Sequence, residues 1–148
     1  MTAPPSGSLL FDTAIYIRFC RGEGYPWLED TRVFGRTVLT AVVAAELYAG
    51  TRTHQEKRYL DALCQAYQAS GHFSFPRAEA WTDTGMLLSR ARKTLGQMDF
   101  VHHFRDLLIA LEAVRADATL ITENARDFER CRTLLASSGR KMKLQNLA

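Results

Sequence analysis

The chain has 148 residues, of which 47% are hydrophobic and 24% charged, enough for one ordinary globular domain with a full core. Its net charge of +3 permits contact with a polyanion but does not require it. The three cysteines, Cys20, Cys64 and Cys131, lie far apart and form no CxxC pair. This spacing indicates neither a zinc site nor a disulfide framework and favours a reducing cytoplasm.

The first half of the chain alternates between strand and helix patterns. Residues 1–7 are expected to be a flexible leader, without the basic start and apolar stretch of a signal peptide. A buried strand is predicted over 8–13 and a helix over 14–22, ended by the glycines before Pro26. A second strand over 36–40 leads into a helix that Thr40 caps and that runs to about Gly50. Residues 53–69 have the apolar spacing of another helix.

The second half continues the alternation. A strand is predicted over 72–76, a helix over 77–95, a loop over 96–104 and a helix that starts at Asp106 and runs to about 116. A strand over 118–122, a helix over 127–136 and an edge strand over 141–147 complete the chain. Strands that alternate with helices predict an α/β domain with a mainly parallel sheet. We expect residues 8–148 to form this single domain, with no segment long enough to span a membrane.

Four acids stand against apolar segments of the sequence: Asp12, Glu46, Asp106 and Asp127. An unpaired charge in an apolar setting is costly, so each carboxylate needs an explanation. The three aspartates would also suit helix N-caps, and Glu46 would also suit an internal salt bridge. In a parallel sheet, ligands collect beyond the carboxyl ends of the strands, where at least three of these acids are expected.

A divalent cation is the simplest partner for four clustered carboxylates. Mg²⁺ and Mn²⁺ prefer oxygen ligands, and the near absence of histidine and cysteine at these positions argues against zinc. Such an ion activates water and neutralises charge on a phosphate, which suits phosphodiester hydrolysis. His102 and His103 are expected to face solvent from a loop; the alternative is that one of them contacts a phosphate at the cleft.

Four segments of the chain together resemble the PIN-domain family, and within it the VapC-type toxins of bacterial toxin–antitoxin pairs. They are residues 9–13 (LLFDT), 40–50 (TAVVAAELYAG), 105–110 (RDLLIA) and 118–128 (ATLITENARDF). The resemblance implies a three-layer α/β/α fold and Mg²⁺- or Mn²⁺-dependent cleavage of RNA by metal-activated water. It also implies a homodimer that is restrained by a cognate antitoxin.

The resemblance assigns roles to individual residues of this chain. Asp12, Glu46 and Asp106 match the three core metal-binding acids of the family. We expect Asp127 to be the fourth catalytic and metal-binding acid, with Asn124 as a neutral ligand or orienting group and Thr13 in support. Two features depart from the family pattern: Ala14 replaces a usual asparagine, and residues 101–105 are bulkier than usual.

Other functions stay open from the sequence. A PIN-like module that binds RNA or a partner without useful catalysis would accommodate both departures. A phosphotransfer receiver domain would need adjacent acids after the first strand and a lysine after the last strand of the site, and neither is present there. Basic residues recur near the acids, including Arg105, Arg126, Arg130 and Arg132, and are expected to form a rim that binds a nucleic-acid backbone or an ordinary solvated surface.

Overall fold

The fold is built on a central sheet of five parallel strands. A computed structural model describes residues 3–94 and 100–147, with strands in the order β3-β2-β1-β4-β5. The strands are β1 (Leu9–Phe11), β2 (Thr37–Thr40), β3 (Phe73–Ser74), β4 (Thr119–Thr122) and β5 (Lys143–Asn146). Leu10 of β1 is aligned with Val38 of β2 on one side and with Leu120 of β4 on the other. The predicted α/β class with a parallel sheet is confirmed.

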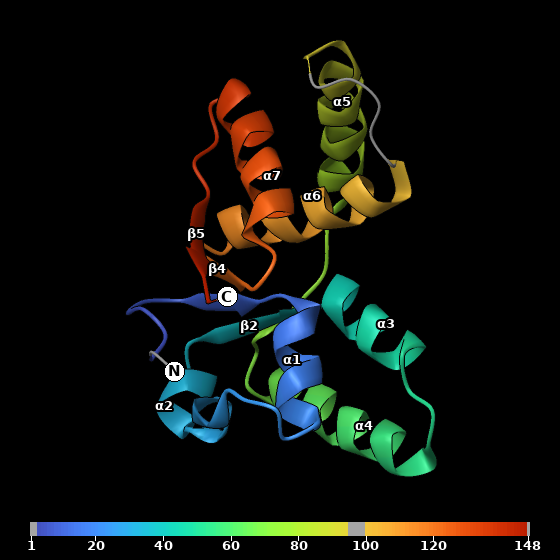
Figure 1. The fold of residues 1–148 in the computed structure, drawn as a ribbon, viewed down its shortest axis with the longest axis vertical. Coiled ribbons are helices and arrows are strands. Elements are labelled where there is room, and N and C mark those ends of the chain that lie inside the picture. Colours follow the sequence, from blue (N-terminus) through green and yellow to red (C-terminus); the bar gives the residue numbers. More distant parts are fainter. Residues whose placement is uncertain (1–2, 95–99, 148) are drawn as a thin grey trace.

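Helices cover both faces of the sheet, which gives the three layers that were expected. Figure 1 shows α5 (Ala78–Thr94), α6 (Phe100–Arg115) and α7 (Ala125–Ser137) above the sheet, with α1 (Thr13–Cys20), α2 (Thr31–Phe34) and α4 (His54–Ala69) below it. The short helix α3 (Ala41–Ala49) contacts α1, α4 and α6. A 3₁₀ turn, η1 (Pro26–Glu29), precedes α2.

The central strand explains where the core lies. Leu9, Leu10 and Phe11 are all at most 1% exposed, without the alternation of a half-solvated strand. Both faces of β1 are therefore covered, as the continuous apolar run of a parallel central strand requires. The chain runs from β1 outward to β2 and β3 and then returns to the other side of β1 with β4. Strand order thus reverses between β1 and β4, the place where α/β sheets open a binding crevice.

One element boundary was predicted wrongly by more than two residues. The helix expected to start at Asp106 starts at Phe100, so residues 100–104 are helical and not part of a loop. Residues 95–99, which comprise the end of the predicted helix over 77–95 and the rest of the predicted loop, lie outside the described residues. A further difference is that η1 and α2 were not predicted; Pro26 at the first position of η1 and the Asp30 side chain, which accepts from the backbone N–H of Arg32, start them. None of the described helices is both long and apolar enough to cross a membrane.

Candidate metal centre

Asp12 follows directly after the central strand. It caps α1, with Oδ1 accepting from the backbone N–H of Thr13 at 2.7 Å, so the capping alternative holds for this residue. Its other oxygen, Oδ2, accepts a hydrogen bond from the hydroxyl of Thr122 at 3.0 Å. Two strand ends, those of β1 and β4, therefore fix the orientation of this carboxylate. The cap leaves Asp12 at the point where strand order reverses.

Glu46 reaches the same place from α3. The hydroxyl of Thr13 donates to Glu46 Oε1 at 3.0 Å, so one residue supports both Asp12 and Glu46. The second oxygen of Glu46 lies 2.9 Å from Nη1 of Arg105, and the Glu46 side chain is 23% exposed. The internal salt bridge considered for Glu46 therefore exists. Its partner comes from α6 and lies among the acids.

Asp106 is the most buried of the four acids. It lies inside α6 at 2% exposure, so the prediction that it might cap a helix is wrong. Its Oδ2 is buried and accepts no hydrogen bond from the described residues. The nearest basic side chains are His102, with Nε2 at 3.4 Å from Oδ2, and Arg105, with Nε at 3.6 Å from Oδ1. A buried carboxylate oxygen without a hydrogen bond is costly unless a ligand completes it.

Asp127 and Asn124 come from the start of α7. Asp127 lies in the first turn and does not cap the helix; Asn124 holds the cap position but makes no side-chain capping bond. Instead, Nδ2 of Asn124 donates to Asp127 Oδ2 at 2.7 Å. The backbone N–H of Asn124 donates to Thr122 Oγ1 at 2.9 Å. Thr122 therefore joins the Asp12 side of the site to the Asn124–Asp127 side, and the sequence analysis missed it.

The two histidines were placed wrongly by the sequence analysis. His102 lies on α6 with Nε2 2.8 Å from Asp127 Oδ2, and His103 is only 5% exposed. Neither is a solvent-facing loop residue, because the helix begins before them. The signal that was available is the spacing of His102 and Asp106, four residues apart, which places both on one face of a helix.

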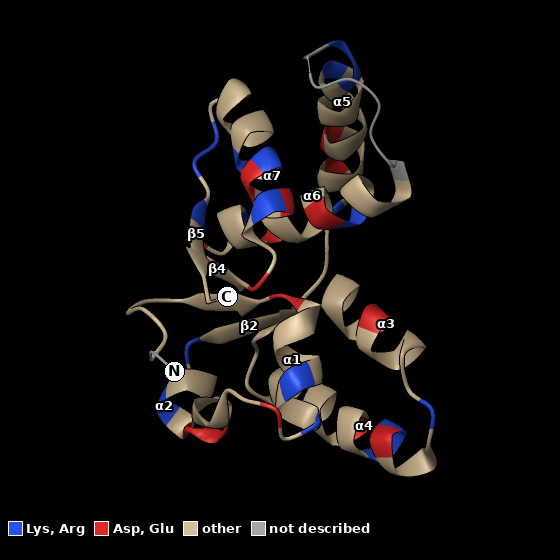
Figure 2. Ribbon diagram, viewed as in Figure 1, with Lys and Arg blue, Asp and Glu red and all other residues tan. Residues whose placement is uncertain are grey.

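A continuous set of contacts joins the four acids, which we call the acid pocket: Asp12, Glu46, Asp106 and Asp127. Thr13 joins the first two, Arg105 contacts the second and third, and His102 contacts the third and fourth. Figure 2 shows acidic positions at the end of β1, in α3 and in α6. Of the basic residues expected at the rim, Arg105 lies within the pocket and Arg132 pairs with Glu129 at 2.8 Å.

Burial is the main influence on three of these carboxyl groups. It raises the pKa of Asp12, of Glu46 and of Asp106, and the neighbouring carboxylates add a smaller upward contribution to the last two. The hydrogen bond from His102 instead lowers the pKa of Asp127 and raises that of the imidazole. Burial therefore disfavours the charged form of three of the four carboxyl groups.

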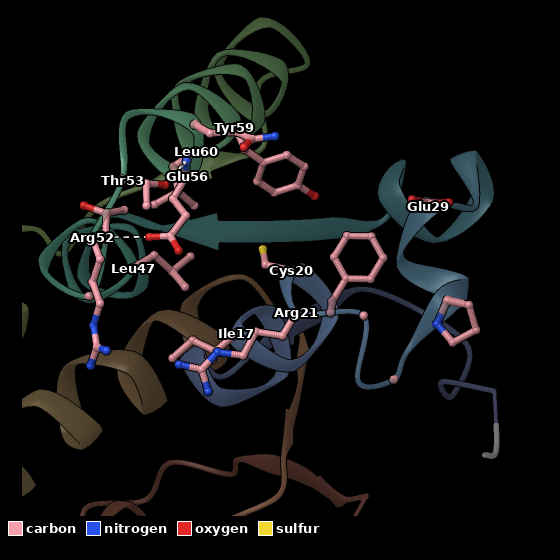
Figure 3. Close-up of a pocket in the computed structure, with 17 residues that line it drawn as sticks. Ile17, Cys20, Arg21, Glu29, Leu47, Arg52, Thr53, Glu56, Tyr59 and Leu60 are labelled. Carbon is pink, nitrogen blue, oxygen red and sulfur yellow. Dashed lines mark hydrogen bonds between the residues drawn. The ribbon is translucent and has the colours of Figure 1, made fainter.

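Two hollows on the surface differ in their relation to the acid pocket. The larger, about 960 Å³, lies between α1 and α4, and Figure 3 shows Cys20, Tyr59 and Leu60 projecting into it. None of the four acids lines it. The second, about 700 Å³, is an apolar groove between α3 and α6 that Glu46 and Arg105 border. Its other lining residues are Ala41, Val42, Ala45, Phe75, Pro76, Trp81, Val101, Phe104 and Leu108.

Three solved structures resemble this chain along nearly its whole length. VapBC from Salmonella typhimurium bound to DNA has a TM-score of 0.66 and 16% sequence identity, and the match covers 97% of this chain and 100% of that chain. VapBC2 from Rickettsia felis bound to a promoter DNA fragment has a TM-score of 0.64 and 17% identity, with coverage of 95% and 98%. VapBC-1 from nontypeable Haemophilus influenzae has a TM-score of 0.61 and 20% identity, with coverage of 93% and 96%. The chain has a PIN-domain fold. At these identities the likeness concerns the fold alone. No protein-family model and no curated protein sequence matches the chain.

The PIN-domain fold of this chain supplies a donor set that fits a divalent cation. One ligand atom each from His102, Asp106 and Asp127 lies within 4.8 Å of the others. Asp106 Oδ2 contributes a buried oxygen that has no hydrogen-bond partner among the described residues. Two carboxylates and an imidazole at this spacing can hold a divalent cation.

Proposed function

We propose that this chain is a Mg²⁺- or Mn²⁺-dependent endoribonuclease, the VapC-type toxin of a toxin–antitoxin pair. Asp12, Glu46, Asp106 and Asp127 would hold the ion, with Thr13 and Asn124 in support. The observation that carries the proposal is the Asp106 carboxylate, which is 2% exposed and has one oxygen without a hydrogen bond. A helix interior does not place such a group beside three further acids unless a cation compensates it.

The residues of the pocket have separable tasks in this proposal. A bound Mg²⁺ or Mn²⁺ would supply Lewis-acid stabilisation of phosphate charge and activation of water. Asp12 is held in place by the hydroxyl of Thr122 and the backbone of Thr13, so its carboxylate is oriented before any ligand arrives. Arg105, whose Nη1 lies 2.9 Å from Glu46, would supply a guanidinium for contact with the phosphate backbone of RNA.

Further basic residues on α7 would extend RNA contact beyond the pocket. Arg126 and Arg130 flank Asp127 on the same helix, and neither forms an ion pair with a described residue. Free guanidinium groups beside a catalytic pocket bind the nucleic-acid backbone without reading its sequence. Substitution of both by glutamine is expected to weaken RNA binding and to reduce its dependence on salt.

Cleavage of RNA under controlled metal conditions tests the proposed function. Purified protein is incubated with a mixed pool of structured RNAs in Mg²⁺, in Mn²⁺ or in EDTA, beside Asp12→Asn and Asp106→Asn. We expect cleavage that needs the metal and is lost in both variants. Equal background in every tube would instead support a PIN-like module that binds RNA or a partner without catalysis. The pairing of Arg105 and His102 with the acids is the observation that favours this second candidate.

We also propose a cognate antitoxin and a second copy of this chain as partners, in a reducing cytoplasm. The VapBC structures that share the fold, the hollow between α1 and α4, and the three free cysteines support this assignment. Phe75, Trp81 and Val101 are 64%, 49% and 77% exposed beside the apolar groove, an arrangement that suits burial against protein. Light scattering of the purified chain, alone and with the product of the adjacent gene, measures both associations.

A further inference from the structure

His102 is placed as a ligand would be. Its Nε2 lies 2.8 Å from Asp127 Oδ2 and 3.4 Å from Asp106 Oδ2, and a shared position beside all three atoms would serve one ion. His102 and Asp106 are one helical turn apart, so a rigid helix presents the imidazole nitrogen and the carboxylate oxygen in the same direction. The third atom comes from α7, a separate element.

The interaction of His102 with the two aspartates leaves part of the site incomplete. Asp127 Oδ2 already receives hydrogen bonds from His102 and from Asn124, whereas Asp106 Oδ2 is buried and receives none. An imidazole that served only as an ion-pair partner would satisfy the more buried carboxylate first. Asp106 Oδ2 therefore remains without a hydrogen-bond partner among the described residues, and a divalent cation would stabilise this buried oxygen more strongly than one imidazole N–H.

The other ring nitrogen defines what must change when an ion binds. Nδ1 of His102 lies 2.9 Å from Nη2 of Arg105, and because a guanidinium only donates, Nδ1 accepts and Nε2 carries the proton. A metal ion held by Nε2 would require that proton on Nδ1, and an N–H there could no longer accept from Arg105. Because Arg105 also pairs with Glu46, a shift of this one guanidinium would free both groups.

We propose that His102 is a metal ligand, together with Asp106 and Asp127, and that its nitrogen makes the pocket prefer Mn²⁺ to Mg²⁺. The inference rests on the proposed function, because both use the same ion. Mg²⁺ binds oxygen ligands almost exclusively, whereas first-row transition ions accept imidazole and bind it more tightly toward the end of the row. An all-carboxylate pocket would show a weaker preference.

Direct metal binding without RNA tests this inference. Isothermal titration at one fixed pH compares Mn²⁺ and Mg²⁺ for the whole chain, for His102→Gln and for the control His54→Gln, an exposed residue at the start of α4. We expect His102→Gln to weaken Mn²⁺ binding by roughly tenfold or more and Mg²⁺ binding by less than about threefold. The control variant should bind both ions as the unchanged chain does, and circular dichroism should confirm that both variants are folded.

The imidazole itself provides the second readout. In ¹⁵N spectra of labelled histidine, Mn²⁺ should broaden the ring signals of His102 at substoichiometric concentration, before those of His54. Unchanged or tighter Mn²⁺ binding in His102→Gln would overturn the inference, since the imidazole would then compete with the ion. RNA cleavage is scored separately. If the unchanged chain cleaves RNA with metal but His102→Gln binds Mn²⁺ as tightly as before, the role of His102 as a ligand is wrong and the nuclease function stands. If the chain binds Mn²⁺ selectively through His102 but does not cleave RNA, the nuclease function is wrong and the ligand role stands.

Discussion

Two buried acids on the same helix, Asp106 and Glu112, have different surroundings. Glu112 is 1% exposed, and its Oε2 accepts from Nη2 of Arg115 at 2.5 Å and from the hydroxyl of Ser74 at 3.3 Å. Asp106 is 2% exposed, its Oδ2 accepts no hydrogen bond from the described residues, and nitrogen atoms of His102 and Arg105 lie 3.4 and 3.6 Å from its carboxylate oxygens. One oxygen of Glu112 also lacks a hydrogen bond, but the other has two.

The comparison separates a structural carboxylate from one that awaits a ligand. Arg115 also donates to the backbone carbonyl of Phe75, so Glu112 fastens α6 to the segment after β3. The Oε2 atom of Glu112 thus has two hydrogen-bonding partners from the chain itself, one of them a cation. Asp106 is surrounded by further acids at the carboxyl ends of the strands, where partners from the chain are few. Burial and one oxygen without a hydrogen bond are therefore common to both acids; the difference is that Glu112 has a hydrogen-bonded ion pair on its other oxygen, and no such bond to Asp106 is formed by the described residues.

Substitution of the two acids should have opposite effects, and these are the largest we expect. Asp106→Asn should reduce metal-dependent RNA cleavage by roughly 100-fold or more, because the ion loses a ligand. Its melting temperature without metal should stay the same or rise, since a buried charge is removed. Glu112→Gln should lower the free energy of unfolding by about 1–3 kcal/mol while the folded fraction still cleaves RNA. Cleavage assays and denaturant titrations measure both; an inactive but stable Glu112→Gln would contradict the comparison.

Removal of the Thr122 hydroxyl, which joins the Asp12 side of the site to the Asn124–Asp127 side, should have the next largest effect. Thr122→Val takes away the donor to Asp12 and the acceptor for the Asn124 backbone, and should cost about 1–3 kcal/mol of unfolding free energy and weaken Mn²⁺ binding. Thr119→Val is the matched control, since Thr119 lies on the same strand and its hydroxyl makes no hydrogen bond with a described residue. Denaturant titration should separate the two variants; equal losses would contradict the role of Thr122.

Arg105 should have a smaller effect on metal binding, and of opposite sign. Its guanidinium lies 2.9 Å from Glu46, with side chains 39% and 23% exposed, so the pair is partly screened by solvent. Arg105→Gln should therefore tighten Mn²⁺ binding by only about two- to fivefold, as expected for loss of a competing surface ion pair. The same variant should bind RNA less tightly. Calorimetric titration checks the first effect, and weaker Mn²⁺ binding would show that Arg105 supports the site instead of competing for it.

The smallest effect concerns the pH dependence of stability without metal. The folded-state pKa is raised for Asp12, Glu46, Asp106 and His102, so the folded chain binds more protons than the unfolded chain between about pH 4 and 7. Stability from these groups is present at the acid end of this window and is lost as pH rises. Asp127 has a lowered pKa and acts in the opposite direction, at and below about pH 4.

Thermal melts in EDTA should therefore give a higher melting temperature at about pH 5.5 than at about pH 7.5, by a few degrees. Asp106→Asn should reduce this difference, and Mn²⁺ at the higher pH should restore the lost stability. A metal-free melting temperature that rises steadily from the lower to the higher pH would show that the acids are not held in a shared, poorly solvated pocket.

The parts of the site that sequence could predict are those fixed by strand ends. Asp12 follows an apolar run and Asp127 follows the strand that pairs with it, so parallel pairing brings them to one edge. The contribution of His102 was not predicted, because its spacing from Asp106 has meaning only on a helix, and that helix starts six residues before Asp106. Tertiary contacts, including the ring of Phe104 against Trp81 at 5.6 Å, support the helix there. Contacts between residues far apart in the sequence cannot be predicted from the spacing of neighbouring residues.

Anomalous diffraction from crystals grown with MnCl₂ tests the central claim most directly, because it locates the ion independently of any activity. We predict a Mn²⁺ peak in the acid pocket, within coordination distance of Asp106 and of at least two of Asp12, Glu46 and Asp127, with Arg105 turned away from Glu46. An empty pocket at saturating Mn²⁺, with Arg105 still paired to Glu46, would contradict the account.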